Sequence, residues 1–548
     1  MSNLSKIFNE TKIQVPNKSA FDMSHITSGT LKTGQLIPAL VEPLLPGDKV
    51  SLGALAEINF APFATQPYGK IDLCMEAFFV PYRVIWGGWE NFITMPSNNP
   101  FSDTVVRPTS LPTINLTNNK NAAFKLRGSK FGNGSLADYL GVNGGSALEF
   151  GESDQLNAMP FLAYHKIYDD WYRNSNIQKP VFARTAPGAS NTAKNVPYSP
   201  ISFNFAYTRP SGDTTGDYTL TSANMKFGDG SEITDIRQRN WGKDYFTTAS
   251  LYPQANGDVV GSSVELPVSN SKTSLSISAL RSANSLQRWL ERNNIAGARY
   301  IEQIRATYGV VPSDAALQRA IFLGSSRTPI YTKGVETNSE GSDTQSVNPF
   351  AGQVGNKAGS ALGVSSSNLV GEFEASEHGY LMVLVSVVPH ATYSSGIRRY
   401  LLETTVGSLP NPMLQGLGEQ AIYREEISGF LPEEFQRSTF GYQPQYSHYK
   451  YHNDEIHGEL RDGMSLSSFA IQRSFDKGAV LGSDFLEISP NELDQISAVS
   501  SNVSNLTAWY NIGFEFKKIS TLSEYIIPTI DGHYNTHTES IPNRGIQL

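Results

Sequence analysis

Three histidines in the C-terminal part of the chain have the side chains best suited to metal chemistry. His448, His452 and His457 lie close together, and Asp454 and Glu455 stand between them. Imidazole and carboxylate groups both serve as metal ligands. The surrounding stretch is rich in Tyr and is predicted to form a loop, so the spacing of the three histidines does not place their rings on one face. We therefore predict no bound metal, and we expect no other cofactor.

Adjacent acidic residues are the second group with possible chemistry. Such pairs stand at 169–170, 425–426 and 433–434. Glycoside hydrolysis needs two carboxyl groups that face one bond, whereas neighbours in sequence rarely point the same way. The chain also lacks the G-x-x-x-x-G-K-[ST] phosphate loop and the G-x-S-x-G hydrolase elbow. We predict no catalytic residues and no enzymatic activity.

One basic pattern points to a binding surface. Arg281, Arg288 and Arg292 lie on a predicted helix at 276–308, at positions i, i+7 and i+11. At about 100° per residue the three side chains fall within roughly 40° of one another. They are candidates for a contact with DNA phosphates or with a neighbouring subunit. A solvated helix face is the alternative.

The composition of the 548 residues favours β-strands and long ordered loops around these groups. Aromatic residues make up 11% and charged residues only 17%, with 46 Gly and 30 Pro. This much apolar and aromatic material excludes intrinsic disorder. The formal net charge of −8 argues against binding nucleic acid by bulk charge. The single cysteine, Cys74, excludes an intramolecular disulfide framework and is expected to pack as a small apolar residue.

Strand signals occur near both ends of the chain. Residues 71–80 are apolar enough to be buried on both faces, 380–388 form the most apolar stretch, and apolar residues alternate at 509–516. Phe78, Phe79 and Trp86 are the candidate core residues. The apolar run at 380–389 is too short to cross a bilayer, which needs about 20 residues. No secretory signal is recognised, so we expect a soluble protein made in the cytoplasm, with no membrane partner.

Strands at both ends with irregular chain between them predict one β-domain closed by its terminal segments. The predicted organisation has an arm, one domain with two large insertions, a possible surface excursion and a tail. The arm is 1–35, and the domain is 36–520, with insertions at about 96–370 and 396–505. The possible surface excursion is 184–235, and the tail is 521–548.

Several short strings, in a fixed order, resemble the major capsid proteins of the Microviridae, with the gokushovirus-like branch most similar. Examples are Leu45-Pro-Gly-Asp48, Ala77-Phe-Phe-Val-Pro-Tyr-Arg83 and Met159-Pro-Phe-Leu-Ala-Tyr164. The resemblance spans about residues 19–470. The Gly-rich run of the family differs here at 295–300, and its large variable insertion before the long helix is nearly absent.

The resemblance implies a mainly β fold, an eight-stranded antiparallel jelly roll of viral capsid type with long inter-strand loops that carry a few helices. It also implies a structural protein of the virion that self-assembles into an icosahedral T=1 shell. Implied partners are other copies of the chain, a circular single-stranded DNA genome, a small basic DNA-binding virion protein, a minor pilot protein and an unidentified host receptor. Assembly would take place in the host bacterial cytoplasm.

Two other functions stay open from the residues alone. Jelly rolls also serve as carbohydrate-binding proteins, and a β-rich glycosidase could use one of the acidic pairs. Particles or pentamers in light scattering would favour the shell subunit, and a monodisperse monomer would favour the other two.

Overall fold

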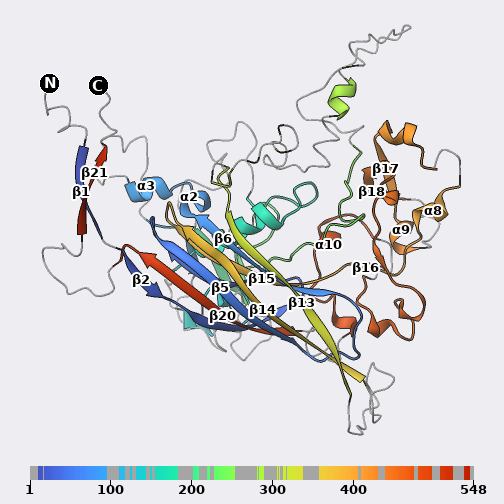
Figure 1. Cartoon of the computed structure of the whole chain (residues 1–548), viewed down its shortest axis with the longest axis horizontal. Coiled ribbons are helices and arrows are strands. Elements are labelled where there is room, and N and C mark those ends of the chain that lie inside the picture. Colours follow the sequence, from blue (N-terminus) through green and yellow to red (C-terminus); the bar gives the residue numbers. More distant parts are fainter. Residues whose placement is uncertain are drawn as a thin grey trace.

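The fold was analysed in a computed structural model of the whole chain (Figure 1). The structure describes residues 10–16, 18–94, 110–117, 124–125, 131, 133–142, 149–150, 155–182, 202–208, 219–222, 227–253, 281, 283–288, 305, 308, 311, 313–315, 317–336, 357–404, 409–429, 438–473, 475, 479–496, 507–522 and 536–542. Among these residues, no helix has both the length and the apolar character needed to span a membrane.

One large antiparallel sheet organises the described part of the chain. Its nine strands follow the order β2-β20-β5-β14-β13-β6-β15-β4, and β3 extends the edge made by β2 along β20. The strands are β2 (Ser19–Asp22), β3 (His25–Lys32), β4 (Ile37–Leu44), β5 (Lys49–Phe60), β6 (Ile71–Pro81), β13 (Ile321–Glu336), β14 (Lys357–Glu374), β15 (Gly379–Pro389) and β20 (Thr507–Ser520).

Eight of these strands pair as a folded ribbon. Counted along the chain from β3, the first pairs with the eighth (β20), the second (β4) with the seventh (β15), the third (β5) with the sixth (β14), and the fourth (β6) with the fifth (β13). Further pairing of β20 with β5, β13 with β14, and β15 with β6 joins these pairs into one curled sheet. This wrapping order is that of a jelly roll, so the predicted fold is confirmed.

The inside of the curled sheet is the main hydrophobic core. Along β5, buried and more exposed residues alternate over the whole strand, and Leu52 and Ile58 are completely buried. On β20, Tyr510, Ile512 and Phe514 point into the same core, as their alternation predicts. Each inward row removes apolar side chains from water, which is the main stabilising term of such a sheet.

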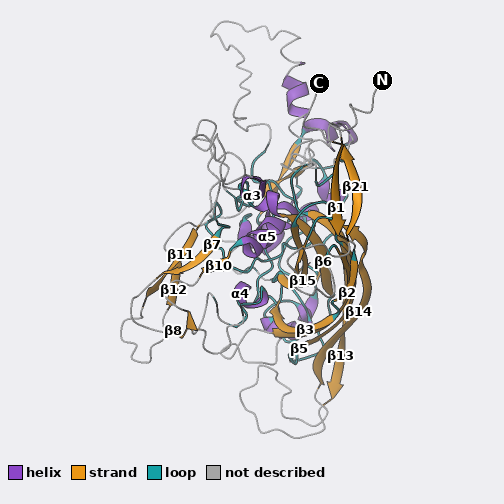
Figure 2. Cartoon of the chain, turned by 90° about the vertical axis from the view of Figure 1, so that its left-hand side faces the viewer, coloured by secondary structure: helices purple, strands orange, loops and turns teal. Residues whose placement is uncertain are grey.

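Two strands, β6 and β15, are buried on both faces. Phe79 and Leu381 face the inner core, whereas Phe78 and Met382 belong to a second core on the outer side of the same strands. Helix α5 (Met159–Ile167) and its π-helical continuation η1 (Tyr168–Tyr172) cover that side. Figure 2 shows α5 between the large sheet and a smaller sheet of β10, β7, β11 and β12.

The remaining elements are short. The smaller sheets use β7 (Thr113–Thr117), β10 (Gln155–Asn157), β11 (Ser202–Thr208), β12 (Thr219–Ser222), and the pairs β8 (Phe124–Lys125) with β9 (Glu149–Phe150), β16 (Thr392–Tyr393) with β19 (Asp454–Glu455), β17 (Glu419–Tyr423) with β18 (Thr439–Pro444), and β1 (Glu10–Pro16) with β21 (Thr536–Pro542). The helices are α2 (Tyr82–Ile85), α3 (Trp89–Thr94), α4 (Leu136–Tyr139), α8 (Arg399–Leu402), α9 (Glu425–Ser428), α10 (Ser483–Leu486), and the 3-10 turns η4 (Pro412–Leu417), η6 (Ser447–Tyr449), η7 (Gly458–Leu460), η8 (Ser467–Phe469) and η9 (Asp494–Ile496).

The structure differs from the expected organisation at the N-terminal arm. Residues 19–22 and 25–32, expected in the arm, form β2 and β3 of the large sheet. Their Ser, Thr and Gly residues give only a weak strand pattern in the sequence. Pairing with β20 is what holds these residues in the sheet. The strands β1 and β21, near the two termini, pair with each other in a ribbon that stands apart from the large sheet in Figure 1.

The strands β13 and β14 also lie inside a segment expected to be an insertion, 96–370. Their inward residues include Ala361, Gly363 and Ser365, which carry little apolar signal. Of the expected excursion at 184–235, the described residues 227–235 pack on the protein, with Ile233 buried in the second core. Exposure of the rest of this segment on a particle stays a prediction.

Two truncations should separate the terminal ribbon from the sheet. Removal of residues 1–17 deletes β1, and an isolated two-stranded ribbon is marginally stable in water, so the fold should survive with little change in melting temperature.

Removal of residues 1–32 also deletes β2 and β3, exposes the edge of β20 and takes away buried Leu31. Loss of a buried Leu side chain alone costs about 2–5 kcal/mol, so this variant should be insoluble or unfolded. Circular dichroism melts check both, and equal stability of the two variants would contradict the assignment of β3.

Candidate functional site

The three candidate core residues lie in two layers. Phe79 is completely buried inside the curled sheet, whereas Phe78 and Trp86 are buried in the second core beneath α5. The Phe78 ring lies 5.8 Å from the Trp171 ring of η1. These aromatic residues therefore fix the layer of helices to the outer face of β6.

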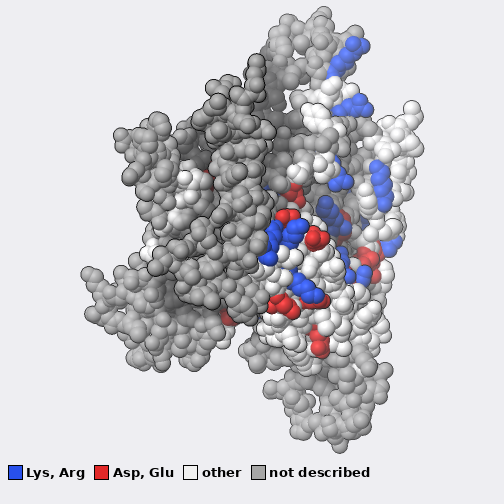
Figure 3. All heavy atoms as spheres, turned by 60° about the vertical axis from the view of Figure 1, so that its left-hand side comes forward, with Lys and Arg blue, Asp and Glu red and all other residues white. Residues whose placement is uncertain are grey.

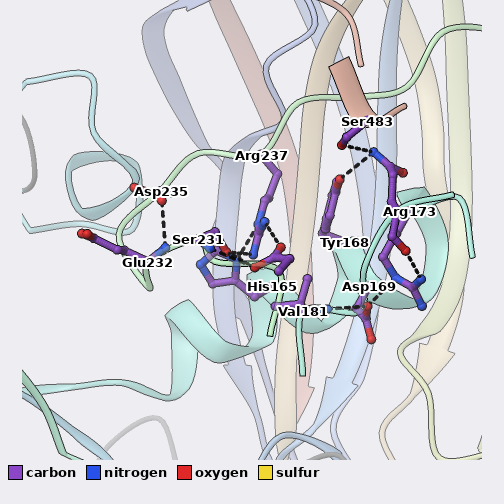
Figure 4. A network of polar contacts seen from close by, with 12 residues as sticks. His165, Tyr168, Asp169, Arg173, Val181, Ser231, Glu232, Asp235, Arg237 and Ser483 are labelled. Carbon is purple, nitrogen blue, oxygen red and sulfur yellow. Dashed lines mark hydrogen bonds and ion pairs between the residues drawn. The ribbon is translucent and has the colours of Figure 1, made fainter. Parts of the chain in front are cut away.

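A buried arginine joins α5 to the segment that follows the smaller sheet. The Arg237 Nε donates to His165 Nδ1 at 2.9 Å, and its two terminal nitrogens donate to Asp229 Oδ2 at 2.5 Å and Ser231 Oγ at 2.6 Å. Figure 4 shows this guanidinium between the helix and the loop. The same group lies 4.9 Å from the centre of the Tyr168 ring. Arg237 thus binds four partners and fixes the loop at 229–237 to α5.

The protonation state of His165 follows from its contacts. The ring is completely buried, its Nδ1 accepts from Arg237, and its Nε2 lies 2.9 Å from the Ile233 carbonyl oxygen. Nδ1 is therefore unprotonated, and Nε2 carries the hydrogen that it donates to Ile233. Burial, and then the positive charge of Arg237, hold the pKa of His165 well below its usual value. The imidazole is neutral and serves as a structural tether.

The neighbouring acidic pair, 169–170, has two separate structural roles. Asp169 accepts from Arg173 Nε at 2.6 Å and from the Val181 backbone N–H at 3.1 Å (Figure 4). Asp170 pairs with Lys166 at 2.9 Å and accepts from the Ala320 N–H. The two carboxylates therefore do not face one bond. The i, i+4 spacing of both ion pairs is the signal in the sequence that predicts this arrangement.

A second polar tether fixes the loop after residue 237 to β6. Both terminal nitrogens of Arg239 donate to the Glu76 carboxylate, at 2.8 and 2.9 Å, and the Tyr172 hydroxyl donates to the same carboxylate. Burial, and then the charge of Glu76, raise the pKa of Tyr172 well above its usual value, so the phenol stays protonated. Tyr172 and Arg239 are 96 and 163 positions from Glu76 in the chain, and no local sequence pattern predicts their contact with it.

The structure describes only part of the candidate arginine group. Arg281 and Arg288 are exposed on a helical segment at 283–288 and the adjoining residue 281, whereas Arg292 lies outside the described residues. Figure 3 shows that the cationic and acidic side chains of the described residues are interspersed on this face and that the described cations do not line a single groove. The group stays a candidate for a DNA or subunit contact.

Two of the three histidines contact different glutamates, and the third is exposed. His448 Nε2 lies 3.0 Å from Glu403, and its pKa is lowered to about 4 by burial and by Arg399. His457 lies 3.4 Å from Glu455, and His452 is exposed. Within the described ranges, no group of three or more His, Cys, Asp or Glu side chains is arranged to hold a metal ion.

The acidic pair at 425–426 is also engaged in packing. Glu426 accepts from Arg399 at 2.8 Å, from the Tyr245 hydroxyl at 3.1 Å and from the Tyr423 N–H at 2.8 Å. Burial raises its pKa in spite of these partners. Residues 433–434 lie outside the described residues.

One face of the large sheet is left uncovered by the part of the chain that the structure describes, and apolar residues lie on it. A cross-strand row runs through Thr30, Trp509, Asn59, Leu362 and Tyr331. Trp509 is 48% exposed and Tyr331 is 72% exposed.

Parallel rows on the same face carry Val364, Leu55 and Ile26, with exposed fractions of 59%, 58% and 70%. We call these six apolar residues, including Leu362, the uncovered face. Clustered exposed apolar residues of this kind mark interaction sites.

Two lysines on the strands of the uncovered face are paired with acids. Lys517 lies 2.7 Å from Glu515, and Lys49 lies 3.4 Å from Glu374. The face therefore combines apolar and aromatic residues with lysines whose positive charge is partly offset by neighbouring carboxylates. This combination suits a protein partner better than a nucleic acid.

Comparison with known proteins places this arrangement in context. Residues 11–527 match the model of a family described as capsid protein (F protein). The chain is 24% identical to capsid protein VP1 of Chlamydia phage 1, with 95% of this chain and 97% of the relative covered. It is 24% identical to capsid protein VP1 of Bdellovibrio phage phiMH2K (95% and 98% covered) and 23% identical to that of Spiroplasma virus 4 (92% and 93% covered).

The neutral state of His165 predicts a pH dependence of stability. Because the folded pKa is lower than the unfolded value of 6.5, the unfolded chain binds an extra proton below about pH 6.5. This histidine should therefore remove up to about 1.4 kcal/mol of folding free energy per pH unit as the pH falls below that value. Urea unfolding of the unassembled subunit between pH 5 and 8 measures it. His165→Gln should flatten the slope, and an unchanged slope would contradict the assignment.

Proposed function

Because the chain belongs to the capsid protein (F protein) family, we propose that many copies of it build the closed icosahedral shell of a small tailless phage. The protein is a structural major capsid protein, and its place is the virion. The resemblance to the gokushovirus-like Microviridae seen in the sequence is confirmed by the same matches.

The observation that carries the proposal is the jelly-roll wrapping of the large sheet in a chain matched over residues 11–527. A closed shell needs a rigid wall unit that repeats with point-group symmetry. The inner core and the polar tethers of Arg237 and Arg239 supply that rigidity. No specific observation favours a carbohydrate-binding protein or a glycosidase, since the described acidic pairs are engaged in packing.

The finer parts of the proposal concern the particle. We propose a T=1 arrangement of about sixty copies around a circular single-stranded DNA genome, assembled in the host bacterial cytoplasm. A small basic DNA-binding protein and a minor pilot protein complete the virion, and a host-surface receptor binds its exterior. The chain acts without catalysis.

The uncovered face is the contact that we propose between copies. Its apolar and aromatic residues resemble the core of a protein interface, and two lysines on its strands, Lys517 and Lys49, pair with Glu515 and Glu374. Each subunit contact adds a modest free energy, and closure of the shell multiplies these contacts into high avidity.

Electron microscopy and sedimentation of the purified protein test both statements. Wild-type protein should form icosahedral particles, and a monomer under all conditions would overturn the proposed function. Val364→Glu should leave a folded subunit, since the side chain is 59% exposed, but should reduce particle yield at least tenfold.

Val480→Glu is the matched control, because Val480 is 68% exposed and lies outside the uncovered face. It should assemble normally. Particles from Val364→Glu at the wild-type yield, or a defect confined to DNA content, would show that the face does not contact another copy.

The arginine group has its own test. In Arg281→Gln/Arg288→Gln/Arg292→Gln, a role in DNA contact predicts empty shells with reduced genome content, and a role in subunit contact predicts no shells. The ratio of absorbance at 260 to 280 nm and micrographs distinguish these results. Normal shells with normal genome content would leave the group as a solvated helix face.

A further inference from the structure

A deep cleft lies among the short elements of the C-terminal part of the chain. Its volume is about 580 Å³, and residues of β16, α8, η6 and β19 line it. Figure 1 shows α8 and β16 to the right of the large sheet, and none of the lining residues belongs to the uncovered face. Each copy of the chain therefore carries two different surfaces that a second copy could contact.

The walls of the cleft are mainly aromatic. Tyr245, Phe246 and Tyr393 form its buried part, and the rings of Phe246 and Tyr393 lie 5.0 Å apart. Tyr400 and Tyr451 also line the cleft and are more than half exposed. Tyrosine offers an apolar ring and a polar hydroxyl together, and it is enriched in protein interfaces for this reason. Such walls suit an aromatic side chain of a partner protein.

The charge beside the cleft selects the partner further. Three arginines line it, and two of them, Arg398 and Arg399, pair with glutamates of the chain itself. Arg461 is exposed, donates to the Ile456 carbonyl oxygen at 3.3 Å and lies 3.4 Å from His457 Nδ1. In the described part of the chain no carboxylate pairs with Arg461. The cleft therefore presents a cation that an acidic group of a partner could neutralise.

The uncovered face carries the matching pair of groups. Glu57 lies in the middle of this face, between Val364 and Asn511 on the neighbouring strands, and is exposed. It accepts from the Asn59 amide at 3.3 Å, and no cation among the described residues pairs with it. Trp509 lies opposite Asn59, two positions from Glu57 and thus about 7 Å along the strand. A half-exposed indole and a free carboxylate are therefore neighbours on this face.

We propose that the uncovered face of one copy docks on this cleft of a second copy, with Trp509 between the tyrosines and Glu57 paired with Arg461. The inference rests on the proposed function, in which copies meet through the uncovered face, and it names the surface on the other side. Aromatic anchors that fill a pocket of the partner dominate the binding energy of many interfaces.

The charges also set the symmetry of this contact. If two uncovered faces met each other, the Glu57 carboxylates of both copies would approach one another without a free cation between them. Contact between the face and the cleft brings opposite charges together instead. Because the two surfaces differ, the interface is heterologous, and such contacts produce a closed ring when the rotation between copies closes.

Reversal of the two charges tests the pairing. Arg461→Glu and Glu57→Arg should each lower the yield of particles at least tenfold, with little change in the melting temperature of the subunit, since both side chains are exposed. The double variant restores opposite charges and should recover at least half of the wild-type yield. Lys179→Glu and Glu90→Arg are matched controls at exposed positions outside both surfaces, and they should assemble normally. Wild-type yield from either single variant, or a double variant no better than the two singles, would overturn the pairing.

The aromatic anchor has a separate test. Trp509→Ala should lower particle yield about tenfold, whereas Trp509→Tyr keeps a ring for the cleft and should retain most of the yield. Circular dichroism melts verify that both subunits are folded. Equal yields from the two folded variants would contradict insertion of the ring.

Cysteine crosslinking tests which surfaces meet. The native Cys74 is buried, so a bismaleimide reagent should react mainly with introduced thiols. Glu57→Cys and Arg461→Cys remove a charge without reversing it, so particles should still form. Particles co-assembled from both variants should give covalent dimers, and particles of either variant alone should give none.

The same samples separate this inference from the proposed function. Dimers from Glu57→Cys alone would show that two uncovered faces meet, and mixed particles without dimers would show that the cleft is not the partner surface. Either result would overturn the inference and leave the shell function intact. Failure of the wild-type chain to form particles under all conditions would instead overturn the proposed function.

Discussion

The pairing of β3 with β20 is the contact on which the rest of the structure depends. It joins segments near the two ends of the chain, and the Ser28 hydroxyl bonds to Asn511 across 483 residues at 2.8 Å. Gly29 lies opposite Tyr510, and a Cβ at this glycine would come within 2.6 Å of the Tyr510 hydroxyl. The edge strand therefore needs a glycine at this point for the buried tyrosine to pass beneath it. Because this pair closes one of the longest loops in the sheet, its formation carries a large entropic cost and should come late in folding.

This closure also determines which faces of the sheet the rest of the chain can cover. The long insertions leave and return at strand ends, and the helix α5 covers β6 and β15. Those two strands are accordingly apolar on both faces. On β5 and β20, by contrast, inward apolar residues alternate with outward residues of mixed character. The pattern of one-sided and two-sided burial thus distinguishes the strands that the described chain covers on both faces from those that it covers on one.

Sequence reasoning succeeds where apolar pattern and local spacing carry the information. It predicts the strands at 71–80, 380–388 and 509–516, because runs of large apolar residues are their signal. It misses β3 and β14, since small residues such as Gly29, Gly363 and Ser365 face inward there and have little hydrophobic weight. The histidines that are close in sequence do not share a site, since His448 and His457 contact different glutamates. The Arg237 tether and the cleft are formed by residues distant in sequence, and only the tertiary fold brings such groups together.

The charge of the chain explains why its contacts with a genome should be few and weak. Every nucleotide brings a negative charge, and each copy of this chain adds a net −8. In the proposed particle the net charge of the shell opposes the charge of the enclosed strand, so binding there depends on local cationic groups together with aromatic stacking. Neutralisation of the remaining phosphates has to come from counterions or from a separate basic protein. In the proposed particle the DNA is therefore held through many small contacts, which salt weakens together.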